Sequence, residues 1–230
     1  MKIAIIGIEW DMVDLIESIP QYEICGFIDP ICPQDIDVSY LGRDEDWKTI
    51  QQKHPQIKVA LALDFPHIKA KLFDHYGEEA IISVISPHAY VSNRSVIGHG
   101  TIIQRGVTIM AKVKIGHGCK INVNTTIHHE AKLGNFCTVA PGAFILGKVE
   151  IEDGAYIGAG AIIRQRCKIG KGAVIGAGAV VVCDVPPGIT VVGVPAKALV
   201  KEPVAKRTDL VPNRSFATGS KVSSSQYDPS

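Results

Sequence analysis

The stretch that decides the fold begins at Val91 and ends at Val185. In blocks of six it reads VSNRSV IGHGTI IQRGVT IMAKVK IGHGCK INVNTT IHHEAK LGNFCT VAPGAF ILGKVE IEDGAY IGAGAI IRQRCK IGKGAV IGAGAV VVCDV. Every block opens with Val, Ile or Leu, and the residue four places later is never larger than valine. Helical solenoids need repeats of about 20 to 45 residues, whereas a six-residue repeat is typical of a parallel β-helix. The sequence therefore predicts a parallel β-helix.

If each block forms one side and three sides make a coil, residues eighteen apart stack strand on strand, about 4.8 Å apart. The aliphatic residue then points into a narrow core, and the small residue lies at a corner. Glycine often follows the aliphatic residue directly, and we expect these glycines to supply unusual backbone angles at the corners. They are Gly98, Gly116, Gly134, Gly158, Gly170 and Gly176.

Residues 1–85 alternate strand and helix instead. Apolar runs predict strands over 2–6, 22–28, 58–63 and 81–85, and a helix is predicted where apolar residues recur at i, i+3, i+4 and i+7 from Met12. Trp47 and Ile50 indicate a short helix, and Asp64 is the expected N-cap of a helix carrying Tyr76. This alternation predicts a small Rossmann-like α/β domain with a parallel sheet. We expect an α/β domain over 1–85, a β-helix over 86–200 and a flexible tail over 201–230.

Composition excludes several classes of function. The formal net charge is +1 over 230 residues, so no strong field for nucleic acid or membrane is expected. No run of eighteen apolar residues is present, and the first twenty positions include acidic residues where a signal peptide would be apolar, which predicts a soluble, cytoplasmic protein. The six cysteines form no C-x-x-C pair, and Cys119, Cys137 and Cys167 fall at the small inward position. We expect reduced packing residues and no metal site.

The first strand and helix imitate a dinucleotide fingerprint in outline only. The motif needs three glycines, and here Gly7 is followed by Ile8, Glu9 and Trp10. The carboxylates of Glu9 and Asp11 would repel a pyrophosphate at the start of the helix. No NAD-type cofactor is expected. A looser nucleotide-sugar site and a simple connecting turn both remain open.

One group of residues in the repeat has the chemistry of a catalytic site. Asn122, His128, His129 and Glu130 lie within nine residues, and His129 falls on the outward side of the β-helix. Eighteen residues further on is Gly147, one coil away. A histidine beside a bare peptide amide supplies a base and an oxyanion donor, as acyl transfer requires. The alternative is that His129 is a solvated surface residue, as we expect of His99 and His117.

Four segments resemble one family: 122–130, 139–143, 147–149 and 193–197. They are similar to the bacterial sugar acetyltransferases that include the sialic acid O-acetyltransferases and the UDP-4-amino-sugar N-acetyltransferases of bacillosamine biosynthesis. The resemblance implies coils that wind left-handed, against the usual crossover rule. It implies His129 as general base, Glu130 as the residue that orients it, Asn122 as a positioning residue and Gly147 as the oxyanion donor.

The resemblance also implies acetyl-coenzyme A as the donor, bound between coils of neighbouring subunits in a homotrimer. Two identical segments eighteen residues apart, 158–161 and 176–179, predict a stacked patch almost without side chains. The pantetheine arm is expected along Ala159, Gly160, Ala177 and Gly178, although these residues also suit the corners alone. Lys197 is expected either to meet the cofactor phosphates or to be solvated.

For the acceptor, the relatives bind a nucleotide sugar at a glycine-rich first turn. Only Gly7 and Asp29 match that pattern here. The acidic turn residues Glu9 and Asp11 are expected to recognise an amine or hydroxyls on a cationic amino sugar.

The resulting hypothesis is an N-acetyltransferase that acts on a nucleotide-linked sugar of the UDP-4-amino-4,6-dideoxy type, in bacterial surface glycan or lipopolysaccharide biosynthesis. An O-acetyltransferase for a sugar or sialic acid is the first alternative. A γ-carbonic-anhydrase-like metal enzyme would need a His-x4-His spacing. Here Ile121 and Asn122 stand four and five positions after His117, so no second histidine has that spacing. A non-catalytic trimeric scaffold is the last alternative.

Overall fold

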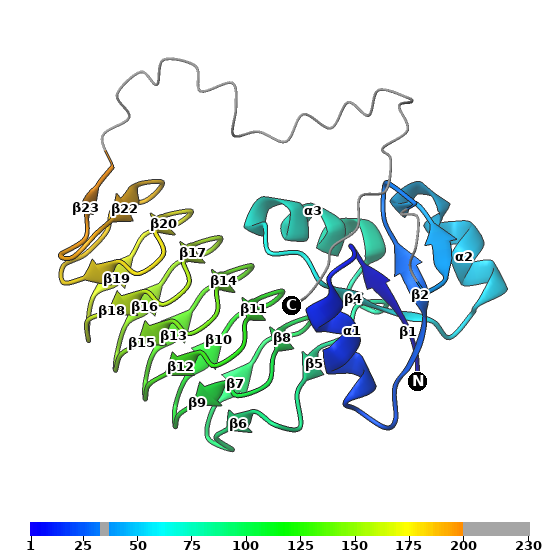
Figure 1. The fold of residues 1–230 in the computed structure, drawn as a ribbon, viewed down its shortest axis with the longest axis horizontal. Helices are drawn as coiled ribbons and strands as arrows, with labels where there is room; N and C mark the ends of the chain where they lie inside the picture. Colours follow the sequence, from blue (N-terminus) through cyan, green and yellow to red (C-terminus); the bar gives the residue numbers. More distant parts are fainter. Residues whose placement is uncertain (33–36, 200–230) are drawn as a thin grey trace, which may run out of the picture. The chain divides into compact units, whose positions relative to one another are not determined.

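The computed structural model describes residues 1–32 and 37–199, and residues 1–199 form one compact unit (Figure 1). The predicted tail over 201–230 lies outside the described residues. The α/β part contains β1 (Lys2–Ile6), α1 (Trp10–Glu17), β2 (Glu23–Ile28), β3 (Tyr40–Gly42), the 3-10 turn η1 (Asp44–Asp46), α2 (Trp47–Lys53), β4 (Lys58–Leu61) and α3 (Pro66–Tyr76). Its sheet has the order β3-β2-β1-β4, with every pair parallel.

The α/β part differs from the sequence-based prediction in two places. Strand β3 was not expected. The predicted strand over 81–85 is divided, because Ile81 forms an isolated bridge to Val59 whereas β5 (Val84–Ile85) pairs with a strand of the coil. The chain thus passes from the parallel sheet into the β-helix within three residues, which a continuous apolar run does not reveal.

The repeat forms three stacks of two- and three-residue strands, and each stack is one face of the coil (Figure 1). The first face contains β5, β8 (Ile102–Ile103), β11 (Lys120–Ile121), β14 (Thr138–Val139), β17 (Tyr156–Ile157), β20 (Val174–Ile175), β22 (Thr190–Val192) and β23 (Lys197–Ala198). The second contains β6 (Tyr90–Val91), β9 (Thr108–Ile109), β12 (Thr126–Ile127), β15 (Phe144–Ile145), β18 (Ile162–Ile163) and β21 (Val180–Val181). The third contains β7 (Val96–Ile97), β10 (Lys114–Ile115), β13 (Lys132–Leu133), β16 (Glu150–Ile151) and β19 (Lys168–Ile169).

The register confirms the predicted eighteen-residue stacking. Ile121 pairs in parallel with Ile103 on one side and with Val139 on the other, and the same step recurs on the other two faces. The repeated aliphatic residues from Ile103 onward are buried in one core together with the small corner residues. Cys119, Cys137 and Cys167 belong to that core and are free thiols, as predicted.

The prediction for the glycines that follow the aliphatic residue was wrong in its reason. Positive φ angles occur two residues later, for example at Gly100 and Gly118. The glycine itself is needed because the coils approach closely: a Cβ on Gly98 would lie 2.4 Å from the carbonyl group of Gly116 in the next coil. Close backbone contact, rather than an unusual angle, excludes a side chain there.

Candidate functional site

Each coil turns at three corners. The first corner joins the first face to the second and contains the turns 86–88, 104–106, 122–124, 140–142, 158–160 and 176–178. The second corner joins the second face to the third, with turns 92–94, 110–112, 128–130, 146–148 and 164–166. The third corner returns to the first face, with turns 98–100, 116–118, 134–136, 152–154 and 170–172.

The second corner places the imidazole of His129 directly against Gly147. A Cβ added to Gly147 would lie 2.9 Å from both Nε2 and Cε1 of that ring. The two residues are one coil apart, and the N–H of Lys148 donates to the carbonyl of His129 at 3.1 Å. Glycine therefore leaves room for the ring, and the ring lies over the bare backbone of the next turn.

Glu130 fixes the orientation of this imidazole. Its Oε2 lies 3.1 Å from Nδ1 of His129, and a carboxylate can only accept a hydrogen bond, so Nδ1 carries a proton and, in the neutral ring, Nε2 is the nitrogen with the free lone pair. The hydrogen bond with His129, together with the nearby ammonium groups of Lys148 and Lys112, lowers the pKa of Glu130. The carboxylate is therefore ionised at neutral pH.

The corners differ in how their central N–H groups are used. At the third corner, the N–H groups of His117 and Asn135 donate to side chains of the next coil, Asn135 Oδ1 at 2.9 Å and Asp153 Oδ1 at 2.7 Å. Among the described residues, nothing accepts a hydrogen bond from the N–H of Gly147 at the second corner or of Ala159 and Ala177 at the first. These N–H groups are therefore unpaired, although only Ala159 and Ala177 are exposed, whereas Gly147 is buried beside the ring of His129.

The predicted side-chain-free patch lies on the first corner, whereas His129 lies on the second. Ala159, Gly160, Ala177 and Gly178 are exposed, and no atom lies within 4 Å of a Cβ built on Gly160 or Gly178. Lys197 is exposed on β23, whose partner strand β22 continues the first face past this patch. In one chain, the patch and the base are thus separated by the second face.

Asn122 also lies on the first corner and does not contact His129. Its Nδ2 donates to the carbonyl of Val139 at 3.0 Å and to Oδ1 of Asp64 at 3.3 Å. The resemblance implies that Asn122 positions the base or the substrate, and within one chain it contacts neither His129 nor Glu130. Its hydrogen bonds place it beside the α/β part instead.

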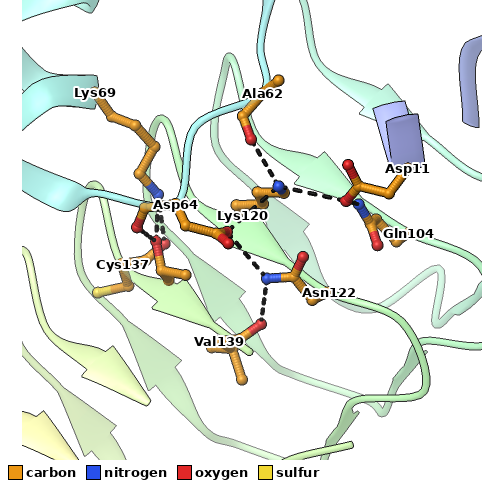
Figure 2. Close-up of polar contacts among 10 residues, drawn as sticks. Asp11, Ala62, Asp64, Lys69, Gln104, Lys120, Asn122, Cys137 and Val139 are labelled. Carbon is orange, nitrogen blue, oxygen red and sulfur yellow. Dashed lines mark hydrogen bonds and ion pairs between the residues drawn. The ribbon is translucent and has the colours of Figure 1, made fainter. Parts of the chain in front are cut away.

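A buried lysine joins the α/β part to the first face (Figure 2). The side chain of Lys120 is 1% exposed, and its Nζ donates to the carbonyl of Ala62 at 2.6 Å. The same ammonium lies 3.4 Å from Asp11 Oδ2 and 3.3 Å from Asp64 Oδ1. Asp64 was predicted to cap α3, but that helix begins at Pro66. The Asp64 carboxylate forms the ion pair with Lys120 instead.

The carboxylate of Asp11 is held on one side only. Its Oδ2 accepts a hydrogen bond from the buried side chain of Gln104 as well as the contact from Lys120. Its Oδ1 is buried and accepts no hydrogen bond within the described residues. Partial burial raises the pKa of neighbouring Glu9, against the effect of Lys120, and the charges of Asp11 and Asp64 raise it further. The carboxylates of Asp11 and Asp64 therefore face a fixed ammonium group within the chain, that of Lys120.

Lys69 forms a second buried link between the two parts. It projects from α3, and its Nζ donates to the carbonyl of Cys137 at 3.0 Å and to Oγ1 of Thr138 at 2.8 Å. Burial lowers the pKa of Lys69 from 10.5 to about 8, because both partners are neutral and compensate the charge only in part.

Replacement of Lys69 should change how stability depends on pH. Between pH 8 and 10.5 the unfolded chain binds more protons at this residue than the folded chain does, so its contribution to the unfolding free energy rises with pH. We expect wild type to gain about 2 to 3 kcal/mol relative to Lys69→Met between pH 7.5 and 10.5. Urea unfolding at several pH values measures the difference. The exposed Lys71→Met is the control on the same helix, and equal pH profiles for wild type and Lys69→Met would contradict the assignment.

The remaining predicted acceptor residues lie at the end of the parallel sheet. Gly7 has φ +82° and donates its N–H to the carbonyl of Ile28 at 2.9 Å. Asp29 accepts a hydrogen bond from the N–H of Ile31 at 2.9 Å, a local turn contact. The space beside Gly7 measures only about 10 Å³ and is mostly apolar. Gly7 thus connects β1 to α1, and the role of Gly7 and Asp29 in acceptor binding stays a prediction.

The pattern of the sequence did not identify Lys120, Asp64, Gln104 or Lys69. Lys120 immediately precedes the inward-pointing Ile121, so the repeat predicts an outward, solvated side chain. Only the packing of the α/β part against the first face buries it. The available signal was the eighteen-residue series on that face, which brings Lys120 and Thr138 into one column with apolar Ile102.

The described part of the chain contains neither a metal-binding group of side chains nor a membrane-spanning helix. Within residues 1–32 and 37–199, no three His, Cys, Asp or Glu side chains are grouped so that they could hold a metal ion. The helices over the same residues are all too short or too polar to cross a membrane.

Comparison with known proteins relates this geometry to a reaction. Residues 112–147 and 148–183 match the bacterial transferase hexapeptide (six repeats) family. A search of curated protein sequences gave no match. The acetyltransferase domain of PglB from Neisseria gonorrhoeae, solved with acetyl coenzyme A, is 28% identical over 86% of this chain and 98% of that chain, with a TM-score of 0.79.

Two further solved structures cover the chain to the same extent. PerB from Caulobacter crescentus, in complex with CoA and GDP-perosamine, is 27% identical over 86% of this chain and 97% of that chain, with a TM-score of 0.77. WeeI from Acinetobacter baumannii is 28% identical over 86% of this chain and 100% of that chain, with a TM-score of 0.79. The similarity confirms the predicted fold class, a small α/β part followed by a left-handed parallel β-helix.

Proposed function

We propose that this chain, an acyltransferase of the hexapeptide-repeat type that resembles the bacterial sugar acetyltransferases, transfers the acetyl group of acetyl-coenzyme A to the amine of a nucleotide-linked amino sugar. The observation that carries the proposal is the imidazole of His129 packed against Gly147, whose N–H has no partner among the described residues. The PerB complex with CoA and GDP-perosamine supports the substrate class.

In the proposed step, the amine nitrogen of the sugar attacks the thioester carbonyl carbon. Nε2 of His129 takes the proton that the amine loses, while the Gly147 N–H donates to the oxygen that becomes negatively charged. When the tetrahedral intermediate collapses, the C–S bond breaks and an amide bond remains. The proton on the imidazole then passes to the departing thiolate of coenzyme A. Glu130 holds the Nδ1–H throughout, which keeps Nε2 directed at the amine.

We further propose that a homotrimer completes each active site. The second face separates His129 from the patch of Ala159, Gly160, Ala177 and Gly178, so one chain cannot bring both to one thioester. The outward residues of that face carry no charge: Tyr90, Thr108, Thr126, Phe144, Ile162 and Val180. Of these, Tyr90 is 64%, Phe144 43% and Ile162 38% exposed. A second copy packed along this face would bring the second corner of one chain to the first corner of its neighbour.

A charge on the second face should therefore disrupt assembly and activity together. For Phe144→Glu we expect a shift from trimer to monomer at micromolar concentration and a loss of about tenfold or more in transfer, because a buried unpaired carboxylate opposes association. Light scattering and a turnover assay measure the two effects. Lys114→Glu on the third face is the matched control. A fully active monomer would contradict the shared site.

The substrate class can be tested by release of free coenzyme A thiol in the presence of GDP-perosamine and its UDP- and dTDP-linked counterparts. We expect turnover with at least one of these amines, and the amide product by mass spectrometry. Turnover only with a free nonulosonic acid or another hydroxyl acceptor would replace N-acetylation with O-acetylation.

A further inference from the structure

The second corner differs from the other two in the residues that adopt a left-handed backbone. At the first and third corners the residue with positive φ is mostly glycine, as at Gly106 and Gly118. At the second corner the residues with φ between 61° and 65° all carry a charge: Lys112, Glu130, Lys148 and Arg166. A left-handed backbone favours glycine, so the shape of the turn does not require these side chains. They therefore serve something other than the turn itself.

Stacking places Glu130 between two lysines. Lys112, Glu130 and Lys148 follow one another at intervals of eighteen residues and occupy the same position in three successive coils. Nζ of Lys148 lies 3.7 Å from Oε2 of Glu130, the same oxygen that accepts from Nδ1 of His129 at 3.1 Å. The positive charge of Lys112 acts on this carboxylate from the preceding coil. One carboxylate oxygen is thus shared by an imidazole and an ammonium group.

The other titratable groups near this site are paired elsewhere or lie farther away. Lys132, two residues after Glu130, pairs with Glu150 at 2.8 Å. The ring of His128 has its centroid 6.4 Å from that of His129. Within one chain, the local charge at the base is therefore one carboxylate against the two lysines of the neighbouring coils.

A carboxylate beside a basic imidazole has two opposite effects. It accepts the hydrogen bond from Nδ1 and thereby directs Nε2. Its negative charge also favours the protonated ring, which has no lone pair with which to take a proton. An ammonium group close to the same carboxylate offsets that charge and leaves the hydrogen bond in place. The two lysines thus preserve the orientation of the ring and oppose its protonation.

We propose that Lys148 is a positioning residue for the base: it holds the carboxylate of Glu130 against Nδ1 of His129 and, together with Lys112, keeps the imidazole in its neutral form. This role rests on the proposed function, in which Nε2 takes the proton of the acceptor amine. It accounts for lysine at the corner that bears the base, at a position where the other corners mostly have glycine. The consequence is that transfer continues on the acid side of neutrality.

Lys148→Met should move the pH midpoint at which His129 is protonated to a higher value. Loss of a nearby positive charge favours the imidazolium, and since Lys148 and Glu130 are 46% and 41% exposed, we expect a shift of about 0.3 to 0.7 pH unit. The Cε1–H resonance of His129 in the full chain labelled with ¹³C-histidine measures the midpoint. The signal that is missing from His129→Ala identifies the resonance.

Two variants control for this shift. Lys148→Arg keeps the charge and should titrate like wild type. Arg166→Met removes a charge from the same corner position, but two coils away from Glu130, and should move the midpoint by less than about 0.2 pH unit because solvent screens that distance. Thermal unfolding should be the same for all these variants, because the side chains of Lys148 and Arg166 are exposed.

The pH dependence of kcat/KM should follow the same shift. On the acid side of the midpoint, Lys148→Met should be about 2- to 5-fold less active than wild type, and the two should be equally active near pH 9. Lys148→Arg should restore the wild-type profile. In 1 M sodium chloride the difference should shrink, because salt screens exposed charges. A loss that is the same at every pH would mean that Lys148 supports the turn and not the base.

The resonance of His129 needs no turnover, so the role of Lys148 and the proposed function can fail separately. Equal midpoints in wild type and Lys148→Met would overturn the role of Lys148 and leave acetyl transfer by wild type as it stands. A shifted midpoint in a chain that transfers acetyl groups to no nucleotide amino sugar would support the effect of Lys148 on the ring and refute the proposed function.

Discussion

His129→Ala should lower kcat for acetyl transfer by about 10² to 10⁴, the range expected for loss of a general base. Its ring is 55% exposed and its hydrogen bond to Glu130 lies at the surface, so the substitution should not affect folding. Since the ring lies over Gly147 and not along the first corner, KM for acetyl-coenzyme A should change little. Steady-state kinetics from pH 5.5 to 9 measures both parameters.

Two controls distinguish catalysis from a structural role. His128→Ala removes the adjacent imidazole, whose centroid lies 6.4 Å from that of His129, and should retain activity within about threefold. Added imidazole should restore part of the activity of His129→Ala, because a small base can occupy the space over Gly147, and it should not stimulate wild type. Near-normal turnover by His129→Ala at neutral pH would place the base elsewhere.

The fold of the coil could be predicted because one local rule is repeated without interruption. Each six-residue block fixes the inward residue, the corner and the register to the next coil, so the stacking of His129 over Gly147 follows from a difference of eighteen. The same arithmetic placed Ala159 and Ala177 in one column. The eighteen-residue spacing alone did not show that Ala159 and Ala177 lie at the first corner whereas His129 lies at the second. Counting turns from Asn122 to His129 along the repeat would have revealed it, because one strand of the second face separates them.

The junction with the α/β part could not be predicted in the same way. Lys120, Lys69 and Asp64 make contacts across 58 or more residues of sequence, and no periodicity relates them. Asp64 has the residue type and position of an N-cap, and local propensity favours that role. The buried ammonium of Lys120 competes for the same carboxylate. The long-range ion pair therefore outweighs the local preference of Asp64 for capping the helix.

The second prediction with a large expected effect concerns stability and follows from the burial of Lys120. Lys120→Met should lower the free energy of unfolding by about 2 to 4 kcal/mol, since removing one member of a buried ion pair leaves its partners uncompensated. We place the value below the upper end for such pairs because Asp11 and Asp64 are 38% and 39% exposed and keep part of their hydration. Urea unfolding at neutral pH measures the loss.

Lys132→Met is a closely matched control. Lys132 also immediately precedes an inward aliphatic residue, and it also pairs with a carboxylate, Glu150 at 2.8 Å, but its side chain is 60% exposed. Loss of that pair should cost about 0 to 1 kcal/mol. The two substitutions thus remove the same group from the same repeat position and differ in burial. Similar losses in both would show that the ammonium of Lys120 contributes no more than a surface charge.

The source of the Lys120 effect can then be separated by a second substitution. If uncompensated negative charge causes the loss, Asp64→Asn in the Lys120→Met background should recover stability, because one of the two remaining carboxylates becomes neutral. If lost packing causes it, the double variant should be no more stable than the single one. Recovery in the double variant would also mean that Lys120 holds Asp11 and Asp64 together by charge. In that case the position of the Asp11 carboxylate depends on the same ammonium group that joins the α/β part to the coil.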